Sequence, residues 1–494
     1  MNTPASPPSA SASYVGVDIG TSVTKAVLFD EAGAVITSAD CRTRLTTPAP
    51  EHVEQDIEDV LASVAAVITK VLAAGGDTRP ALLAITGQGD GCWLGDSRGR
   101  AVRPAVSWLD GRGAAVLAGW EADGTAEAVY RLTGNALFPG AQASILRWLE
   151  DNEPGALDRA ETAGYCKDIV MQRLTGLRAT DASDASLPFG DPATQGYSAQ
   201  AVALCGLGHR AGLLPPVVTP LPTAPLSPDG AALTGLPAGI PVSSGPFDLP
   251  ACAVGAGAER VGDGVLIIGT TLACQVLVDH VDTTGEVTGM HLATGQPERW
   301  LRALPAMVGT ASVDWLLDIL GMRHDQLSEA IGASGPGAGG VEVLPYLAPS
   351  GERAPFVNPA ARGQFTGLRL GTTRADILRG LCEGIAFAAR DCFAVTPLSG
   401  RLLACGGGVR SRPWLQMFAD VLGRPLQVAR APEAGARGAV LAARRAAGQD
   451  AGTRAWTAAE AVVEPDPRTA AQYDEAFARY RQHRAAAEPM WRTT

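Results

Sequence analysis

Two segments of the sequence combine glycine with hydroxyl residues in an order that suits an anion. The first runs from 18 to 25 as DIGTSVTK, and the second, at 267–271, reads IIGTT. A glycine lets the chain turn tightly, so that backbone N–H groups face outward, and neighbouring hydroxyls add donors. An ordinary hairpin would explain either copy alone, but two copies favour a polyphosphate gripped from both sides. The predicted phosphate-binding residues are Asp18, Gly20, Thr21, Ser22, Thr24, Lys25, Gly269, Thr270 and Thr271.

Two aspartates could supply further chemistry of a phosphoryl transfer. Asp248 stands in GPFDLP, at the mouth of a helix that we expect to begin near Pro250. A hydroxyl that attacks a γ-phosphoryl group needs a carboxylate to accept its proton. An N-cap is the other reading of Asp248, and both roles are compatible because a capping aspartate keeps one oxygen free. Asp18 could hold a hydrated Mg²⁺, with Asp248 as the second candidate, both through water.

Polar residues also follow two strands that we expect in the first half of the chain. Gln88 and Asp90 lie in GQGDG, and Trp108 and Asp110 lie in WLDGR. Loops at strand ends of an α/β domain are where small ligands bind, and amide and carboxylate groups suit a polyhydroxylated ligand. For Arg112, contact with the ligand and a solvated loop charge are equally compatible with the sequence. The predicted substrate-binding residues are Gln88, Asp90, Trp108, Asp110 and Asp248.

A third glycine-rich segment follows a buried strand late in the chain. Gly406, Gly407 and Gly408 would let a flat ring or a sugar approach the backbone, and Ser411 could cap the next helix. A flexible turn is the alternative. The segment 335–340 also matches GxGxxG, but it precedes a strand instead of following one, so we expect a loop there and no dinucleotide site.

Lysine is scarce, and its positions exclude two classes of enzyme. The chain has 40 basic residues, of which only Lys25, Lys70 and Lys167 are lysines, and none of these follows a glycine. A Walker A loop requires Gly-Lys-Ser/Thr, and a protein kinase requires a Val-Ala-Ile-Lys strand. If the protein handles a nucleoside triphosphate, it is therefore neither a P-loop NTPase nor a protein kinase.

Composition also limits the partners and the cellular compartment that we expect for this protein. There are 51 acidic residues against 40 basic ones, a net charge of −11, and no basic run, which argues against nucleic-acid and membrane partners. Nine scattered cysteines without a CxxC pair indicate a reducing compartment, and no HExxH zinc motif occurs. No segment is apolar for long enough to span a bilayer, and residues 1–13 have no signal-peptide pattern. We expect a cytoplasmic protein with a loose tail at 1–13.

Apolar runs alternate with amphipathic helical segments, which indicates α/β layering. Thr373 and Asp376 form a capping-box pattern, and the stripe of Tyr473, Phe477 and Tyr480 predicts a packed final helix. The expected strands are 14–19, 26–29, 34–37, 81–86 and 401–405. Helices are expected at 54–74, 141–151, 166–174, 411–421 and 438–447, and a further helix is expected after Thr373.

The strand–turn–strand pattern of 15–29 returns at 265–278, as a weak internal repeat. Between the copies, 213–246 is dense in proline and glycine, and we interpret it as the crossing between two domains. The predicted domains are 14–246, with the first phosphate motif and the site for a polyhydroxylated ligand, and 247–486, with the second phosphate motif and the glycine-rich segment at 406–408.

In this order the motifs resemble the FGGY family of carbohydrate kinases, which has the two-domain, actin-like ATPase (ribonuclease H-like) fold. The similarity extends over 14–480, including GGGVRSRPWLQMFADVLGRP at 406–425, LPYLAPSGERAPFVNPAARGQFTGL at 344–368 and GARGAVLAA at 435–443. The resemblance implies an active site in the cleft between the domains, with Mg·ATP held there. It also implies phosphorylation of a sugar or polyol hydroxyl, with Asp248 as the general base.

Three departures from the family pattern bear on function. Ile145 stands where the family signature usually carries a lysine, and Asp376 stands where many members have histidine. The substrate loop GQGDGCWL lacks the Arg-Glu pair of glycerol kinases and looks closer to the erythritol kinase and L-xylulose kinase branch.

We therefore expect transfer of the ATP γ-phosphate to a terminal hydroxyl of a four- or five-carbon polyol or ketose. A D-xylulose kinase is one alternative, and a non-catalytic actin-like nucleotide-binding protein is another. A small-molecule sugar or polyol is the expected partner, and a homodimer is left open.

Overall fold

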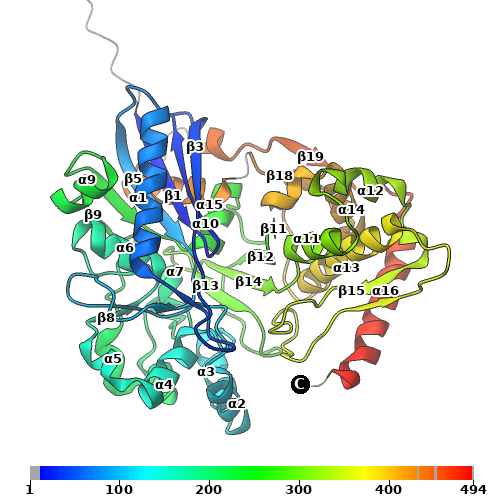
Figure 1. Cartoon of the computed structure of the whole chain (residues 1–494), viewed down its shortest axis with the longest axis horizontal. Coiled ribbons are helices and arrows are strands. Elements are labelled where there is room, and N and C mark those ends of the chain that lie inside the picture. The colour runs from blue at the N-terminus through cyan, green and yellow to red at the C-terminus, as the bar shows by residue number, and fades with distance from the viewer. Residues whose placement is uncertain (1–11, 431–432, 450–452, 492–494) are drawn as a thin grey trace, which may run out of the picture.

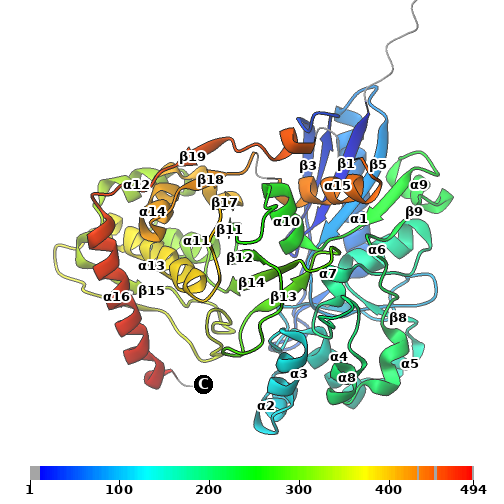
Figure 2. The ribbon, with the colours of Figure 1, turned by 180° about the vertical axis from the view of Figure 1, so that it is seen from behind.

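The protein is built on two mixed sheets that lie side by side (Figure 1, and from behind in Figure 2). The computed structural model describes residues 12–430, 433–449 and 453–491. The first sheet has the strand order β3-β2-β1-β5-β10-β9, with β5 and β10 parallel to β1 and the other pairings antiparallel. Its strands are β1 (Ser13–Ile19), β2 (Val23–Phe29), β3 (Val35–Arg42), β5 (Pro80–Gly87), β9 (Thr223–Pro225) and β10 (Pro241–Ser244).

The second sheet repeats the plan of the first. Its order is β13-β14-β12-β11-β17-β18-β19, in which the hairpin β11–β12 corresponds to β1–β2, and β17 and β18 run parallel to β11. The predicted internal repeat and the predicted α/β class are therefore confirmed. The strands are β11 (Gly264–Ile268), β12 (Leu272–Val278), β13 (Met290–Ala293), β14 (Trp300–Ala306), β17 (Leu402–Cys405), β18 (Leu426–Val428) and β19 (Ala461–Val463).

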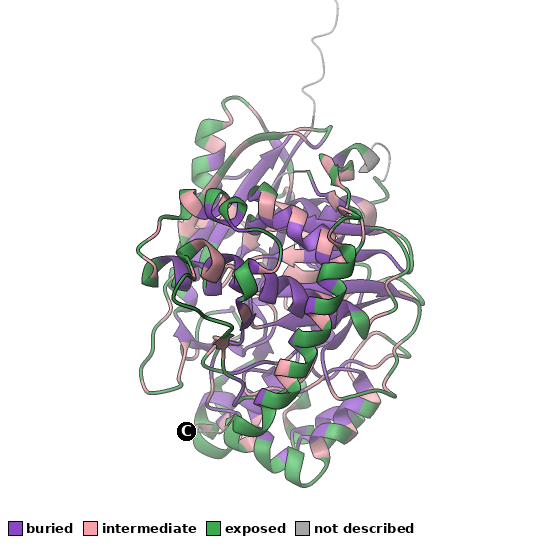
Figure 3. Ribbon diagram, turned by 90° about the vertical axis from the view of Figure 1, so that its right-hand side faces the viewer, coloured by how far each residue is buried: buried purple, intermediate pink, exposed green. Residues whose placement is uncertain are grey.

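Helices cover both sheets, and burial follows this layering, with strands and inner helix faces buried (Figure 3). Short strands complete the framework: β4 (Glu54–Gln55), β6 (Trp93–Gly95), β7 (Ala105–Val106), β8 (Thr162–Gly164), β15 (Glu342–Leu344) and β16 (Gln364–Thr366). The helices of the first half are α1 (Ile57–Ala74), α2 (Ala114–Ala122), α3 (Thr125–Thr133), α4 (Gln142–Asn152), α5 (Pro154–Arg159), α6 (Cys166–Thr175), α7 (Ala182–Ala185), α8 (Ala199–Leu204) and α9 (Pro228–Thr234). Those of the second half are α10 (Asp248–Ala256), α11 (Thr310–Ile319), α12 (Leu327–Ala333), α13 (Arg374–Ala394), α14 (Arg412–Leu422), α15 (Ala434–Ala446) and α16 (Ala470–Ala487).

Two predicted boundaries at the start of the chain were wrong. Helix α1 begins three residues later than expected because the Asp56 carboxylate accepts hydrogen bonds from the N–H groups of Glu58 (2.7 Å) and Asp59 (3.3 Å). The two residues before Asp56 form β4 instead. Ser13, placed in the tail, is the first residue of β1, and positions 1–11 of that tail lie outside the described residues.

The interpretation of 213–246 as a crossing between domains was also wrong. Strand β10 pairs in parallel with β5, and β9 pairs with β10, so the segment completes the first sheet. Strand β10 is only four residues long and β9 only three, and each has a proline at one end, so they are too short to show a hydrophobic period. The predicted domain limits of 14–246 and 247–486 stay a prediction.

Helix α15 comes from the second half of the chain but packs against β1 and β5 of the first sheet. Glycines allow its close approach to α10. A Cβ atom on Gly438 would lie 1.8 Å from the Ala251 carbonyl oxygen, and one on Gly255 would lie 2.0 Å from that of Ala434. The two helix backbones are therefore in contact, and α10 is held between the sheets (Figures 1 and 2).

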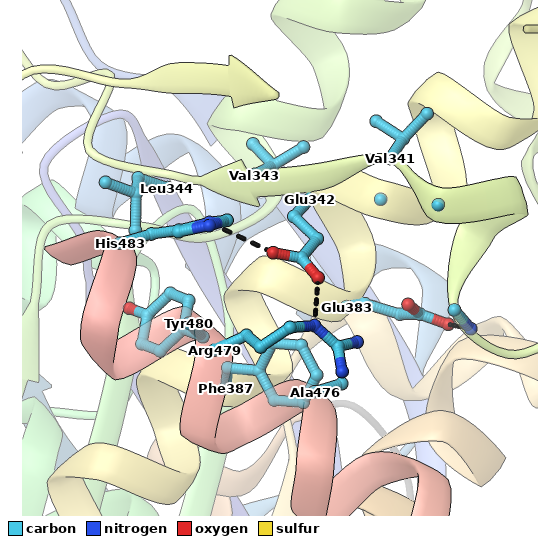
Figure 4. A pocket seen from close by; sticks show the side chains of 13 residues that line it. Val341, Glu342, Val343, Leu344, Glu383, Phe387, Ala476, Arg479, Tyr480 and His483 are labelled. Carbon is cyan, nitrogen blue, oxygen red and sulfur yellow. Dashed lines mark hydrogen bonds and ion pairs between the residues drawn. The ribbon is translucent and has the colours of Figure 1, made fainter. Parts of the chain in front are cut away.

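The predicted aromatic stripe is confirmed as the anchor of α16. Tyr473 and Tyr480 are buried, Phe477 packs on the same cluster, and the Tyr480 hydroxyl lies 2.6 Å from that of Tyr346. Figure 4 shows the neighbouring cavity, where the Glu342 carboxylate of β15 is paired with Arg479 (2.6 Å) and His483 (3.0 Å). At about 40 Å³ this cavity has room for a water molecule, not for a sugar or a nucleotide.

The contact between α10 and α15 generates a test of the fold. We expect Gly438→Ala to lower the free energy of unfolding by about 1–3 kcal/mol, because the added methyl group overlaps a backbone oxygen that cannot move alone. The midpoint of thermal unfolding measures the change. Gly119→Ala in α2 is the matched control, since its methyl group meets open space and should slightly stabilise the helix. Equal midpoints for the two variants would contradict the close contact.

Candidate active site

Asp248 is the first residue of α10, the helix that lies between the two sheets (Figure 1). The N-cap of this helix is Phe247, so the N-cap reading of Asp248 was wrong. Burial raises its pKa to about 8, and the nearby charges of Asp18 and Asp90 add to this, while the Leu249 N–H group and Arg353 oppose it. Asp248 is thus a carboxyl group with an unusually strong affinity for a proton.

Asp90 lies on a backbone that few residues adopt, with φ +57°. The neighbouring residue, Gly89, packs closely against the Phe247 ring, because a Cβ atom at this position would lie 2.7 Å from a ring carbon. This contact places the loop that carries Asp90 beside α10. Asp90 is buried, and burial raises its pKa to about 7, against the opposing charge of Arg353.

Asp18 is the third carboxyl group of this cluster. Burial raises its pKa to about 6, and Lys25, its cross-strand partner on β2, acts in the opposite direction. Gly435 of α15 packs against this carboxylate, because a Cβ there would lie 2.3 Å from Oδ2. Lys25 also has its Nζ atom 4.0 Å from Glu433.

Arg353 is a site residue that the sequence analysis did not single out. It stands in the long loop between β15 and β16, and its guanidinium lies over the rings of Trp108 (5.1 Å) and Phe138 (4.8 Å) from the first half. Its charge acts on both Asp90 and Asp248. The only signal was the pair Glu352-Arg353 in a proline-rich loop, and nothing in that pattern indicates what the side chain reaches.

Glu352 fixes the base of this loop. Its buried carboxylate accepts hydrogen bonds from the N–H groups of Met307 (2.8 Å), Arg353 (2.9 Å) and Ala354 (3.3 Å). The Arg353 Nε atom then donates to the Pro305 carbonyl oxygen (3.1 Å). Arg353 is therefore held in place at both its backbone and its side chain.

A hydrogen-bonded chain connects the first hairpin to the predicted substrate loops. The Trp108 Nε1 atom donates to the Thr21 hydroxyl (2.8 Å), and this hydroxyl donates to the Gln88 Oε1 atom (2.8 Å). The Gln88 amide group in turn donates to Gln55 (2.7 Å). Thr21 and Gln88 therefore hold the loops together, and the Thr21 proton is not available to a phosphate in this arrangement.

The other predicted donors to an anion differ in whether their hydroxyl groups are buried or exposed. The Thr24 hydroxyl is buried and lies 2.7 Å from that of Ser63 in α1, so the expectation that it faces an anion was wrong. Ser22 and Thr270 are exposed at the tips of their turns, and Thr271 is partly exposed. Both three-residue turns, at 20–22 and 269–271, have the predicted hairpin geometry.

The glycine segment at 406–408 lies beside the second hairpin. Cβ atoms on Gly406 and Gly408 would lie 2.6 Å and 2.2 Å from atoms of Ile268, so glycine is required for this approach. Gly407 is exposed. Ser411 occupies the N-cap position of α14, but its hydroxyl lies 2.9 Å from that of Ser328 and makes no capping bond, contrary to expectation.

Asp110 and Arg112 are buried and paired with each other. The Asp110 carboxylate accepts hydrogen bonds from the Arg112 Nε (2.8 Å) and Nη2 (2.9 Å) atoms and from the Val53 N–H group (2.5 Å). Arg112 also reaches Glu54 at 2.7 Å. Arg112 is thus not a solvated charge, and the Asp110 oxygens are occupied by partners within the protein.

Among the described residues, no cluster of three or more histidine, cysteine, aspartate or glutamate side chains could hold a metal ion by itself. Within the same part of the chain, no helix combines the length and the apolar character needed to cross a bilayer.

Comparison with known proteins identifies the family. Residues 13–255 match the N-terminal domain of the FGGY family of carbohydrate kinases, and residues 264–447 match its C-terminal domain. The chain is 35% identical to the erythritol kinase of Brucella abortus (strain 2308), over 97% of this chain and 96% of that protein. The chain belongs to the FGGY family of carbohydrate kinases. It is therefore a phosphotransferase that acts on a sugar or polyol, with ATP as the phosphate donor.

Two further relatives support this assignment. The xylulose kinase of Escherichia coli (strain K12) is 31% identical, over 84% of this chain and 85% of its own. The crystal structure of xylulose kinase from Rhodospirillum rubrum superposes with a TM-score of 0.84 and 30% identity, over 97% of this chain and 99% of that one. The predicted two-domain, actin-like ATPase fold is confirmed.

Two of the three departures from the family pattern, Ile145 and Asp376, have a local structural setting in this FGGY kinase. Ile145 is fully buried in α4, in an apolar cluster of the first half. Asp376 completes the capping box with Thr373, as predicted, and also accepts a hydrogen bond from Ser334 (2.6 Å).

The position of Arg353 leads to a pH-dependent prediction. In Arg353→Gln we expect the acid limb of the pH profile of kcat/KM to move to higher pH, because the lost cation no longer lowers the pKa of Asp90 and Asp248. Activity at neutral pH should fall by roughly tenfold for each unit of the shift. Arg369→Gln, which removes an exposed charge from the same stretch of chain, is the control. An acid limb that stays at the wild-type pH would contradict the effect of Arg353 on the pKa of Asp90 and Asp248.

Proposed function

We propose that this kinase transfers the γ-phosphate of ATP to a terminal hydroxyl of a four- or five-carbon polyol or ketose, with erythritol or L-xylulose as the type of acceptor. The proposal is carried by the position of Asp248, whose proton affinity is raised beside Asp18 and Asp90. The relative named erythritol kinase supports the polyol form of the proposal. The relatives named xylulose kinase favour the alternative, a D-xylulose kinase. A non-catalytic actin-like protein is set aside because the family consists of kinases.

In the proposed mechanism Asp248 is the general base. Its carboxylate accepts the proton of the acceptor hydroxyl as the oxygen of that hydroxyl forms a bond with the γ-phosphorus atom. The bond from the γ-phosphorus to the β,γ-bridging oxygen breaks, and ADP leaves with the electron pair. Burial and two neighbouring carboxylates make Asp248 a stronger base than a solvated aspartate, which is the property this step requires.

We propose distinct roles for the surrounding residues. Asp90 and Arg353, with the Trp108 and Phe138 rings behind them, would form the polar and apolar sides of the acceptor site. The turns at 20–22 and 269–271, together with Lys25, would bind the phosphates. The glycine segment at 406–408 and Ser411 would border the nucleoside. Asp110 would act indirectly, because Arg112 and Val53 already occupy its carboxylate.

The carboxylates also fit the predicted Mg²⁺. Asp18 and Asp248 repel each other, and a divalent cation would offset this repulsion and lower the pKa of both groups. Since the described side chains do not form a three-ligand site, the ion would be held through water and phosphate oxygens. When bound, Mg²⁺ would neutralise charge on the transferring phosphate. A cytoplasmic location is also proposed, supported by nine free cysteines.

The acceptor class can be tested with an ADP-release assay over tetritols, pentitols, pentuloses and glycerol. We expect kcat/KM for a C4–C5 polyol or ketose to exceed that for glycerol by at least about tenfold, or about 1.4 kcal/mol, since a longer acceptor can contact more of the polar site. A preference for D-xylulose would favour the alternative. Turnover that does not depend on any acceptor would contradict the proposal.

Asp248→Asn tests the base. We expect kcat to fall by about 10²–10⁴-fold, because an amide cannot accept the proton, while ADP affinity stays within about threefold. Acceptor-dependent ADP release gives kcat, and calorimetric titration gives the affinity. Asp229→Asn is a matched control, because Asp229 is an exposed aspartate in the first turn of α9. Unchanged turnover in Asp248→Asn would exclude the assigned role.

A further inference from the structure

A buried ionic cluster lies in the first half of the molecule, beside the segment that carries Asp248. Lys167 of α6 has its Nζ atom 2.8 Å from Asp168, 2.7 Å from Asp181 and 2.8 Å from Asp184. All four side chains are almost completely buried. Asp181 is the N-cap of α7 and Asp184 lies within α7, so the lysine ties α6 to α7.

The cluster has an excess of negative charge. One lysine cannot neutralise three carboxylates, and burial raises the pKa of Asp168 and Asp184. Burial also opposes the charge of Lys167, but the three aspartates hold its pKa well above the usual value. Lys167 therefore stays charged, and the carboxyl groups of Asp168 and Asp184 bind protons more strongly than solvated ones. Burial of such a cluster is weak evidence for a stabilising role, since apolar residues of similar volume often pack as well or better.

The cluster contacts the segment 245–247 at two points. The Asp181 side chain packs on Gly245, where φ is +105° and a Cβ would lie 2.7 Å from the Asp181 Cγ atom. The Phe247 N–H group donates a hydrogen bond to the Ser183 hydroxyl oxygen (3.0 Å), and the Ser183 N–H group donates to the Asp181 carboxylate (2.8 Å). An unbroken series of contacts thus runs from Lys167 to the residue before Asp248.

Helix α7 also contacts the second sheet. The Ala293 N–H group of β13 donates to the Ser186 hydroxyl oxygen (2.8 Å), and the Asn135 amide donates to the Ser186 carbonyl oxygen (2.8 Å). The same Asn135 accepts a hydrogen bond from the His291 N–H group (2.9 Å). The element that holds Phe247 is therefore itself fixed to both halves of the molecule.

We propose that Lys167, Asp181 and Ser183 are positioning residues for phosphoryl transfer, and that they fix the 245–248 segment so that the Asp248 carboxylate meets the acceptor hydroxyl. This inference rests on the proposed role of Asp248 as the base. None of the three residues is placed in contact with acceptor or nucleotide. Their effect is on the orientation of Asp248, and a displacement of about 1 Å is enough to slow such a reaction by as much as 10²-fold.

The decisive variant is Ser183→Ala, which removes the acceptor of the Phe247 N–H group and little else. We expect kcat to fall by roughly 10- to 100-fold, while KM for acceptor and for ATP stays within about twofold, because the binding surfaces are unchanged. Ser227→Ala is the matched control. Its hydroxyl likewise accepts a hydrogen bond from a backbone N–H group, that of Gly230 (3.0 Å), and donates to the Leu174 carbonyl oxygen (2.8 Å), but it caps α9 away from this segment. We expect Ser227→Ala to retain wild-type kcat.

Asp181→Asn is a second variant, which keeps the shape of the side chain and lowers the excess charge of the cluster. We expect the same loss in kcat without a change in KM, since the pairing with Lys167 is weakened. Wild-type kcat in Ser183→Ala, alongside an inactive Asp248→Asn, would overturn the positioning role and leave the base intact. An equal kcat loss in Ser183→Ala and Ser227→Ala, or a loss that appears only in KM, would also overturn it. An active Asp248→Asn would instead refute the proposed function on which the inference rests.

Discussion

Between the two sheets, three buried carboxyl groups of like charge are held so close together that two of them, Asp18 and Asp90, raise the proton affinity of the third, Asp248. Asp18, Asp90 and Asp248 come from β1, from the loop after β5 and from α10, and each has a raised pKa. Separated in water they would all be ionised and unremarkable. The protein has to hold them together against burial and repulsion, and much of the surrounding architecture can be understood as the means of doing so.

Glycine contacts and buried polar anchors provide that restraint. Helix α15 reaches both Asp18 and α10 because Gly435 and Gly438 leave no side chain between the backbones. Arg353 brings a positive charge from the other half of the molecule and is fixed by Glu352 beneath it. These are rigid backbone and ionic contacts, and rigidity is what keeps a carboxylate cluster from relaxing into solvent.

Residue patterns in the sequence predicted the structural features that depend on local chain geometry. The two hairpins, the capping box at Thr373 and the buried tyrosines of α16 follow from spacing alone, and the structure agrees with each. The proximity of Asp248 to Asp18 and Asp90 was implied only through the order of motifs. Residue type could not show that the Thr21 and Thr24 hydroxyls are engaged by Gln88 and Ser63, because these partners are distant in sequence. Arg353 was missed for the same reason: its ring partners lie more than two hundred residues earlier.

The return of α15 to the first sheet has a consequence for biosynthesis. Tyr14, Phe29 and Ala84 are buried beneath Val440, Leu441 and Trp456, which the ribosome makes more than 350 residues later. A nascent chain that has completed the first sheet still exposes this apolar face to water until the last quarter of the sequence has emerged from the ribosome. The order of translation and the order of folding therefore diverge, and the earliest strands to be made are among the last to be covered.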